Sequence, residues 1–452
     1  MLWILIEKFG SQLITLLANI YMAKIIQPSE FGLIAMTMVF VAIGQAVSES
    51  GYTQYLIYKK KSLNNVMESS IFWLTLFISF LFSGFVLCIS TWFYEAEVIK
   101  ILPYMLSNII ISSIAIVPKT KLIIERKNRH IAFNLLISSL LGACFAILFT
   151  HLEYEVWAII ALITIKNLTS TFIFFFQSSW RPKLYFDIQF IARSWSFCSS
   201  LILGSVLASF VNNISNMMLG KVYDKSILGA YYQSNMYLST ANVTIFTYIQ
   251  RYIYVKMVGK KSNEINIIIE KEVRVYSTYV LPLFFAFSLV SNEFVSVVLN
   301  DNWSYVSFII KYMAIGYSFL PLISINMLGL TALGKTKKYL RIDIIKHIIS
   351  ILILFGACLF DSNVYIQCLA LSFMISWLIV IHMGKSDGLY DYSQIKTIIP
   401  FYFIAYLCYL IVDSFITIEI AVASAFLKII AYLIIYYMFV YTLNVAIWRK
   451  NK

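Results

Sequence analysis

Polar side chains recur along the first long apolar stretch of the chain. Lys8, Gln12, Thr15 and Asn19 are separated by four, three and four positions, which puts them on one face of a helix. In a helix that crosses a membrane, such a face contacts protein or water rather than lipid. The stripe therefore predicts either the wall of a hydrophilic cavity or hydrogen bonds that join neighbouring helices.

A second stripe with the same spacing lies 197 residues further along the chain. Ser205, Ser209, Asn212 and Asn216 occupy the positions that correspond to the first stripe. The same shift superimposes two further pairs: Lys24 on Lys221, and Gly32 on Gly229. Two matching stripes in an internal repeat favour two walls of one shared cavity, with hydrogen bonding between helices as the alternative.

Several polar and charged residues lie within or beside the apolar stretches, where a charge is costly and therefore a candidate for function. Gln45 extends the cavity wall on the next stretch, and Glu7 and Glu49 are candidates to carry a coupling proton or sodium ion. Lys8, like the deeper Lys166 and Lys311, has the charge to bind phosphate. A pair between Lys8 and Glu49, and lysines that extend towards an interface, are the alternatives.

Enzymatic chemistry finds little support in the sequence. The four histidines and six cysteines have no metal-ligand spacing. No pattern in the sequence indicates a serine–histidine–acid set or a pair of catalytic carboxylates. Residues 329–336 match G-x-x-x-x-G-K-[ST], but a phosphate-binding loop requires a preceding strand within an α/β domain. We therefore expect no catalytic residue, metal or resident cofactor.

The elements that position these residues are long apolar segments. Of 452 residues, 60% are hydrophobic and 13% are charged, whereas soluble proteins have roughly 25% charged residues. Segments of about 20 apolar residues are long enough to cross a bilayer as helices. Fourteen spans are predicted: 5–26, 31–53, 70–93, 98–118, 131–150, 155–178, 195–219, 228–250, 275–299, 305–333, 341–360, 363–383, 397–416 and 419–446.

The net charge of +13 is distributed unequally between alternate loops. Counted from the N-terminus, the even-numbered loops and the C-terminal tail hold most of the Lys and Arg residues, for example Lys59–Lys61, whereas the other loops are acidic. This alternation follows the positive-inside rule. It predicts cytoplasmic N- and C-termini, and it argues against nucleic acid as the partner of the basic residues.

The predicted fold is an all-α multi-pass membrane protein with about fourteen transmembrane helices. The repeat suggests two six-helix lobes, an N-terminal lobe at 1–185 and a C-terminal lobe at 186–385, followed by two helices and a cytoplasmic tail at 386–452. Repeats related by an axis along the membrane normal are typical of transporters that enclose a central cavity.

Three sequence segments resemble the polysaccharide transporter (Wzx-like) family of the multidrug/oligosaccharidyl-lipid/polysaccharide (MOP) flippase superfamily. They are Ile6–Gln12, Pro28–Met36 and Ser50–Tyr52 before the Lys59–Lys61 run. The stretch Asn212–Tyr231 is also similar to this family.

The resemblance implies a flippase that moves undecaprenyl-pyrophosphate-linked oligosaccharide repeat units from the cytoplasmic to the outer leaflet of the bacterial inner membrane. It implies alternating access, a role in capsule, O-antigen or exopolysaccharide assembly, and contact with the polymerase and export machinery. Three alternatives are a drug or cation antiporter of the same superfamily, a polysaccharide polymerase or ligase, and a peptidoglycan-precursor flippase. The antiporter would need a compact acidic site, and the polymerase or ligase a large outer loop.

Overall fold

In the ranges that the structure describes, every regular element is a helix. The computed structural model describes the backbone of residues 2–49, 51–60, 63–385, 393–416, 418 and 420–450, and their side chains apart from 2–8, 241, 243, 244, 247, 248, 250, 251, 393 and 443–450. The helices are α1 (Leu2–Ala23), α2 (Pro28–Glu49), α3 (Tyr52–Tyr58), α4 (Asn65–Phe93), α5 (Ala96–Ile124), α6 (Asn128–His151), α7 (Glu155–Gln177), α8 (Ile188–Val222), α9 (Lys225–Tyr248), η1 (Ile249–Ile253), α10 (Tyr254–Met257), α11 (Ser262–Tyr279), α12 (Leu281–Leu289), α13 (Ser291–Val298), η2 (Asp301–Trp303), α14 (Ser304–Tyr317), α15 (Phe319–Ala332), α16 (Thr336–Ala357), α17 (Ser362–Gly384), α18 (Ser393–Phe415) and α19 (Ala421–Lys450).

These helices confirm the predicted all-α multi-pass fold. Each predicted span coincides with one helix or with two or three consecutive helices. Among the described residues, ten helical segments are long and apolar enough to cross a membrane, or eleven when the bent pair Ser262–Leu289 and Ser291–Val298 counts as one span. The count of fourteen spans is therefore an approximate one.

The chain divides into two compact units, Met1–Tyr232 and Gln233–Lys452. The boundary differs from the division at 185/186 suggested by the internal repeat, because α8 packs against α2 within the first unit. The two lobes predicted from the internal repeat stay a prediction. The two units observed here are the parts of the chain whose residues contact each other most.

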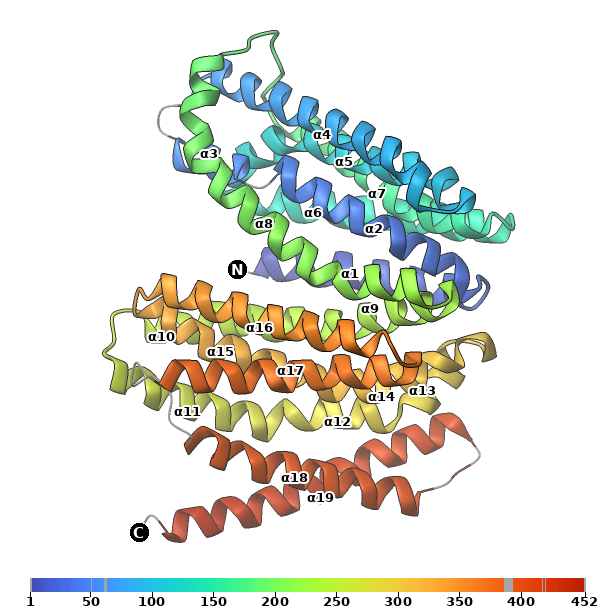
Figure 1. Ribbon diagram of the computed structural model, residues 1–452, viewed down its shortest axis with the longest axis vertical. Coiled ribbons are helices and arrows are strands. Elements are labelled where there is room, and N and C mark those ends of the chain that lie inside the picture. Colours follow the sequence, from blue (N-terminus) through green and yellow to red (C-terminus); the bar gives the residue numbers. More distant parts are fainter. Residues whose placement is uncertain are drawn as a thin grey trace. The chain divides into compact units, whose positions relative to one another are not determined.

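Close helix packing inside the first unit depends on glycine at particular positions. α6 packs along α7 and α1 (Figure 1). A Cβ on Gly142 would lie 2.7 Å from the carbonyl oxygen of Leu162 and 3.0 Å from the Cβ of Lys166. The absent side chain thus lets α6 approach the segment of α7 that carries Lys166.

Gly51 separates α2 from α3 and lets α3 lie against α8. Its φ of +81° is in the left-handed region that favours glycine, and a Cβ there would come within 2.8 Å of the carbonyl oxygen of Cys198. The buried side chains of Tyr52, Leu56 and Phe190 pack in the core beside this turn. This arrangement explains structurally why a glycine directly precedes the short helix.

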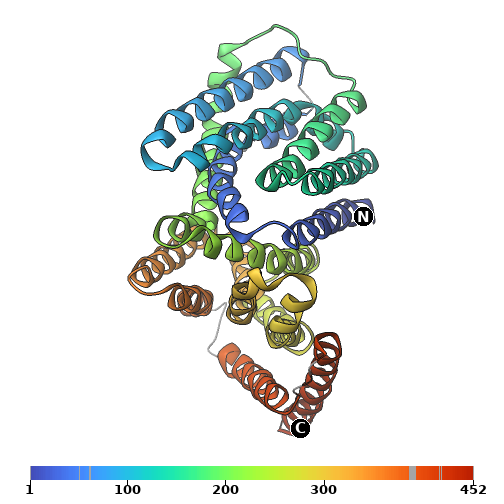
Figure 2. The ribbon, with the colours of Figure 1, turned by 90° about the vertical axis from the view of Figure 1, so that its right-hand side faces the viewer.

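The second unit holds its helices together around a core rich in aromatic residues. Tyr276 of α11, Trp377 of α17 and Tyr432 of α19 belong to one buried cluster. The hydroxyl of Tyr436 donates to the carbonyl of Ser277 at 2.6 Å, which joins α19 to α11. Figure 2 shows α18 and α19 pairing at the C-terminal end of the chain.

The connection that precedes α11 is anchored by an ion pair. Lys256 Nζ lies 2.9 Å from a carboxylate oxygen of Glu272. The hydrogen bond to this carboxylate raises the pKa of Lys256. Since the Glu272 side chain is only 5% exposed, the pairing compensates the cost of burying its charge.

The match to a phosphate-binding loop lies in a turn between two helices. α15 ends at Ala332, Gly334 has φ +72°, and α16 begins at Thr336. No strand precedes this segment in the described part of the chain. The expectation that the match is not a nucleotide site stays a prediction.

Candidate functional site

The polar stripe of α1 faces the interior of the first unit. Asn19 is 4% exposed, whereas Leu13 and Leu17 on the other side of the helix are 55% and 57% exposed. Thr15 Oγ1 donates to the carbonyl of Ser11 at 2.8 Å, and Asn19 Nδ2 donates to the carbonyl of Thr15 at 2.8 Å. The leucines therefore lie on the exposed side of the helix, and Thr15 and Asn19 lie on the side that faces the first unit.

Lys166 joins this stripe from a distant part of the sequence. Its Nζ donates to Thr15 Oγ1 at 3.2 Å, which links α7 to α1. An ammonium group has three N–H donors, of which the hydroxyl accepts one. Lys166 therefore brings an ammonium group from α7 to the inner face of α1.

Gln45 and Glu49 line a polar cavity of about 220 Å³ within the first unit. They are four residues apart on α2 and so share one helical face. Further hydroxyl, amide and ammonium groups line it, from Thr53, Ser112, Lys119, Asn167, Ser170 and Thr171. The apolar part of the lining consists of Ala115, Ile116, Leu135 and Phe174. The sequence prediction missed these partners, although Asn167 and Thr171 also have the four-residue spacing of one helical face.

Hydrogen bonds fix several of the polar groups beside this cavity. Asn167 Nδ2 donates to Asn108 Oδ1 at 2.9 Å, and Asn108 Nδ2 donates to Thr164 Oγ1 at 3.1 Å. Thr171 Oγ1 donates to the carbonyl of Ile111 at 3.1 Å. A carboxylate among fixed amides and hydroxyls can hold a proton, or it can supply the oxygen ligands that a hard cation requires.

The second polar stripe lies on α8. Asn212 is exposed, Ser205 and Ser209 are half-buried, and Asn216 is buried. Asn213, one position away from the stripe, donates from Nδ2 to the carbonyl of Ser209 at 2.8 Å. The shared cavity that this stripe was proposed to line with α1 stays a prediction.

Lys311 lies in the second unit, on α14. Its Nζ is 5.9 Å from the ring centroid of Tyr409 on α18, and its carbonyl accepts a hydrogen bond from Ser288 at 2.6 Å. The residue therefore connects α14 with α18. Its predicted role in binding substrate stays a prediction.

Two charged residues of the predicted site, Glu7 and Lys8, have side chains outside the described residues. Their backbone is part of α1. The pairing of Lys8 with Glu49 and the binding of an anionic head by Lys8 therefore stay predictions.

Lys428, an intramembrane charge in the sequence, lies in a cluster of ionic groups. Its Nζ is 2.6 Å from Glu293 Oε1 and 3.7 Å from Asp413 Oδ1, and Ser424 donates to Glu293 at 2.9 Å. The cluster joins α13, α18 and α19.

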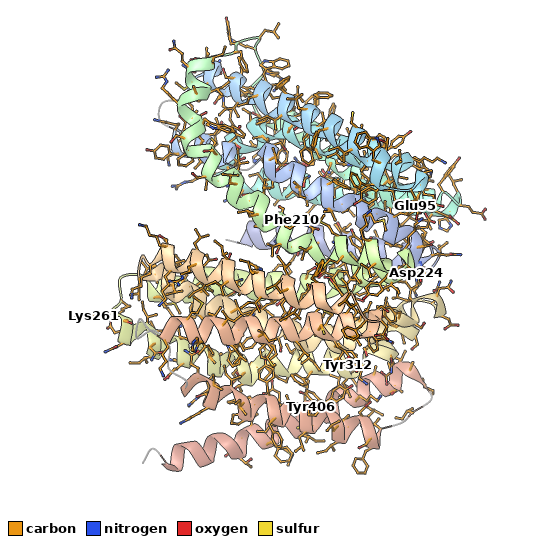
Figure 3. The ribbon with its side chains drawn as sticks, in the orientation of Figure 1. Glu95, Phe210, Asp224, Lys261, Tyr312 and Tyr406 are labelled. Atoms are coloured by element: carbon orange, nitrogen blue, oxygen red, sulfur yellow. The ribbon has the colours of Figure 1, made fainter. Side chains whose placement is uncertain are left out.

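An apolar pocket of about 660 Å³ opens within the second unit. Tyr312 and Tyr406, labelled in Figure 3, line it from α14 and α18. Leu371 and Phe403 on its rim are 51% and 65% exposed. In a membrane, exposed side chains of this kind contact lipid chains.

Residues 21–307 match the family model described as "Polysaccharide biosynthesis protein". The chain belongs to this family.

Two bacterial proteins are similar to this chain in sequence. The chain is 21% identical over 327 residues to the succinoglycan biosynthesis transport protein ExoT of Rhizobium meliloti. The aligned region covers 70% of this chain and 65% of ExoT. The chain is 20% identical over 400 residues to the lipopolysaccharide biosynthesis protein WzxC of Escherichia coli, and this aligned region covers 78% of this chain and 80% of WzxC. The chain thus spans slightly less than two thirds of ExoT.

Solved structures show the same fold. The lipid II flippase MurJ, in an inward closed conformation, superimposes with a TM-score of 0.77 at 13% identity and covers 99% of both chains. An inward-facing multidrug resistance MATE transporter of the MOP superfamily gives a TM-score of 0.55 at 12% identity, over 83% of this chain and 94% of that one. These superpositions show the fold, and the match over residues 21–307 confirms the predicted membership of a polysaccharide biosynthesis family.

Proposed function

We propose that this member of the polysaccharide biosynthesis family is a flippase for oligosaccharide repeat units linked to undecaprenyl pyrophosphate. It moves them from the cytoplasmic to the outer leaflet of the bacterial inner membrane for the assembly of capsule, O-antigen or exopolysaccharide. The observation that carries this proposal is the family match over residues 21–307, on a chain whose fold is that of a lipid flippase along 99% of its length.

The physical problem solved by such a protein is the transfer of a charged sugar head through hydrocarbon. A polar path must replace water around the head, since unsatisfied polar groups in lipid cost several kcal/mol each, on the order of 2–7. The inner face of α1, with Thr15, Asn19 and the Lys166 ammonium group, has the chemistry of one wall of this path. Alternating access then exposes the path to each side in turn.

The prenyl anchor requires the opposite environment. The pocket between α14, α17 and α18 is lined mainly by aromatic and aliphatic side chains, of which Leu371 and Phe403 are exposed. We assign it to the prenyl chain of the substrate, because this chain can enter from the bilayer without leaving an apolar environment.

A coupling ion would supply the driving force, since no nucleotide site is expected. The cavity at Glu49 is the candidate location, with Gln45, Asn167 and Thr171 as neighbouring polar groups. Either a proton or a sodium ion fits a carboxylate in this setting.

Deletion of the gene in its host tests the proposed function. We expect loss of surface polysaccharide and accumulation of lipid-linked repeat units on the cytoplasmic side, both reversed by a plasmid copy. Unchanged polymer, with no trapped lipid-linked intermediate, would overturn the proposal. An export defect restricted to drugs or other cations would instead support the antiporter.

A further inference from the structure

A pocket of about 520 Å³ lies between α3 and the N-terminal part of α8, within the first unit. It is separate from the polar cavity at Glu49, with which it shares no lining residue. Lys59 and Arg193 bring two positive charges to its lining, and Ser196 and Tyr58 bring hydroxyl groups. Both cations lie between predicted spans, in segments that the charge distribution predicts to be cytoplasmic.

Aromatic rings form one wall of this pocket. The rings of Tyr58 and Phe197 stack with centroids 5.5 Å apart and planes inclined by 15°. Tyr55 contacts Phe197 and Phe190 with centroid distances of 5.6 Å and 5.7 Å. Tyr58 is nevertheless 67% exposed, so that a large part of its surface is available to a ligand.

Buried residues support this aromatic wall on the side away from the pocket opening. Tyr55 and Phe190 are 6% and 4% exposed, and Tyr52 and Cys198 beneath them are fully buried. The close approach of Gly51 to the backbone of Cys198 fixes α3 against α8. A preorganised wall of this kind loses little conformational entropy when a ligand binds.

We propose that this pocket binds the sugar-pyrophosphate head of the lipid-linked substrate on the cytoplasmic side, before the head enters the translocation path. This inference rests on the proposed function and adds a loading site to it. The pyrophosphate contacts Lys59 and Arg193, which provide charge-assisted hydrogen bonds. The apolar face of the first sugar ring packs against Tyr58 and Phe197, as amphipathic aromatic side chains allow.

The combination of groups favours this ligand over an ordinary anionic phospholipid. The head of phosphatidylglycerol is attracted by basic residues at the cytoplasmic surface, but its glycerol group has no ring to cover an aromatic wall. The volume also falls within the range of about 300–1,000 Å³ that is typical of small-molecule sites. Phosphatidylglycerol is therefore the competitor against which the proposal is tested.

Binding to the purified full-length protein in detergent tests the two halves of the pocket separately. For undecaprenyl pyrophosphate, we expect the Kd of Lys59→Gln/Arg193→Gln to rise about tenfold, as measured by microscale thermophoresis. The matched control, Lys60→Gln/Lys183→Gln, removes two exposed charges outside the pocket and should leave the Kd within about twofold of wild type.

The aromatic wall is tested with undecaprenyl-pyrophosphate-linked glucose. Tyr58→Leu should weaken binding of this ligand about fivefold while leaving the Kd of undecaprenyl pyrophosphate unchanged. A tenfold excess of phosphatidylglycerol should displace neither ligand.

Three results would overturn the loading site: equal losses in the control variant, no loss in Lys59→Gln/Arg193→Gln, or equal competition by phosphatidylglycerol. Measurement of polymer export in the deletion strain distinguishes a wrong loading site from a wrong flippase function. If the wild-type gene restores polymer and the pocket variant binds and exports normally, only the loading site is wrong. If the wild-type gene neither restores polymer nor clears lipid-linked intermediates, the flippase function itself is wrong.

Discussion

At the scale of single residues, Glu49 combines an ionisable group with a defined polar cavity. Gln45 lies one helical turn before it, and Lys119 reaches the same cavity from α5. A carboxylate in this position can bind and release a cation during each transport cycle. Its amide isostere has the same shape but cannot carry the negative charge.

We predict that Glu49→Gln lowers export about tenfold without lowering the amount of protein in the membrane. Initial export rates measured at several external pH values and sodium concentrations should become insensitive to the ion that couples transport. Glu125→Gln is the matched control, because Glu125 forms an exposed pair with Lys127 that contributes little. Wild-type rates and ion dependence in Glu49→Gln would eliminate Glu49 as the coupling group.

The ionic cluster of Lys428 supports a prediction about stability rather than transport. Lys428 and Glu293 are each 11% exposed, and their charged atoms are 2.6 Å apart. Removal of one partner leaves the other charge buried without its counterion. Lys428→Ala should therefore lower the free energy of unfolding by about 3 kcal/mol.

The melting temperature of the purified protein measures this loss. Addition of Glu293→Gln to Lys428→Ala should restore part of the lost stability, since a neutral amide then replaces the unpaired carboxylate. Lys127→Ala breaks an exposed pair (45% and 39% exposed side chains) and should cost no more than about 1 kcal/mol. A Lys428→Ala protein as stable as this control contradicts the assignment.

At the scale of helices, the internal repeat has a structural counterpart at two equivalent glycines. A Cβ on Gly32 of α2 would lie 2.0 Å from the carbonyl oxygen of Lys225, and a Cβ on Gly229 of α9 would lie 1.8 Å from that of Pro28. The N-terminal turns of α2 and α9 therefore pack backbone against backbone. Lys225 adds contacts of 2.6 Å to Glu95 and to Glu97.

We predict that Gly229→Ala destabilises the protein by about 2 kcal/mol, because the new methyl group has to push α9 away from α2. Gly84→Ala is the control: it also lies within a helix, but no atom lies within 4 Å of its added Cβ. There the higher helix propensity of alanine should stabilise the protein by about 0.5–1 kcal/mol. Thermal unfolding of the two variants measures the difference, and equal melting temperatures would show that the close approach is not required.

Hydropathy and spacing predict much of the fold because lipid requires long apolar helices. They do not predict where the spans break. The turn at Gly51 and the bend of 63° between Ser262–Leu289 and Ser291–Val298 depend on tertiary contacts, which a hydropathy average over about 20 residues does not contain. The predicted spans 31–53 and 275–299 accordingly each correspond to more than one helix.

Some residues of the candidate site can be grouped from their spacing in the sequence, whereas others come together only in the folded structure. Gln45 and Glu49 share a cavity because they are four residues apart on one helix, which the sequence shows directly. The contact of Thr15 with Lys166 joins residues 151 positions apart, and no local pattern encodes it. The same holds for the partners of Lys428, whose acids lie on two other helices.

At the scale of the whole molecule, transport requires that a polar path become accessible to water while the opposite faces of the same helices stay in lipid. α1 allows this to be tested within one element. Gln12, Thr15 and Asn19 are predicted to line the path, whereas Leu13 and Leu17 are the exposed side chains of its other face. Cysteines placed at these positions, in a protein whose six native cysteines have been replaced, report their surroundings through their reactivity.

A thiol reacts with a maleimide as the thiolate, which forms readily in water but not in hydrocarbon. We predict that Gln12→Cys and Asn212→Cys are labelled by a membrane-impermeant maleimide in cells or inverted vesicles, whereas Leu13→Cys and Leu17→Cys react at least about tenfold more slowly. If the path opens to each side in turn, added lipid-linked substrate should shift the labelling of Gln12→Cys between the two orientations. Equal, slow labelling of Gln12→Cys and Leu13→Cys from both sides would mean that the stripe only joins helices, and the flippase would then need a path elsewhere in the molecule.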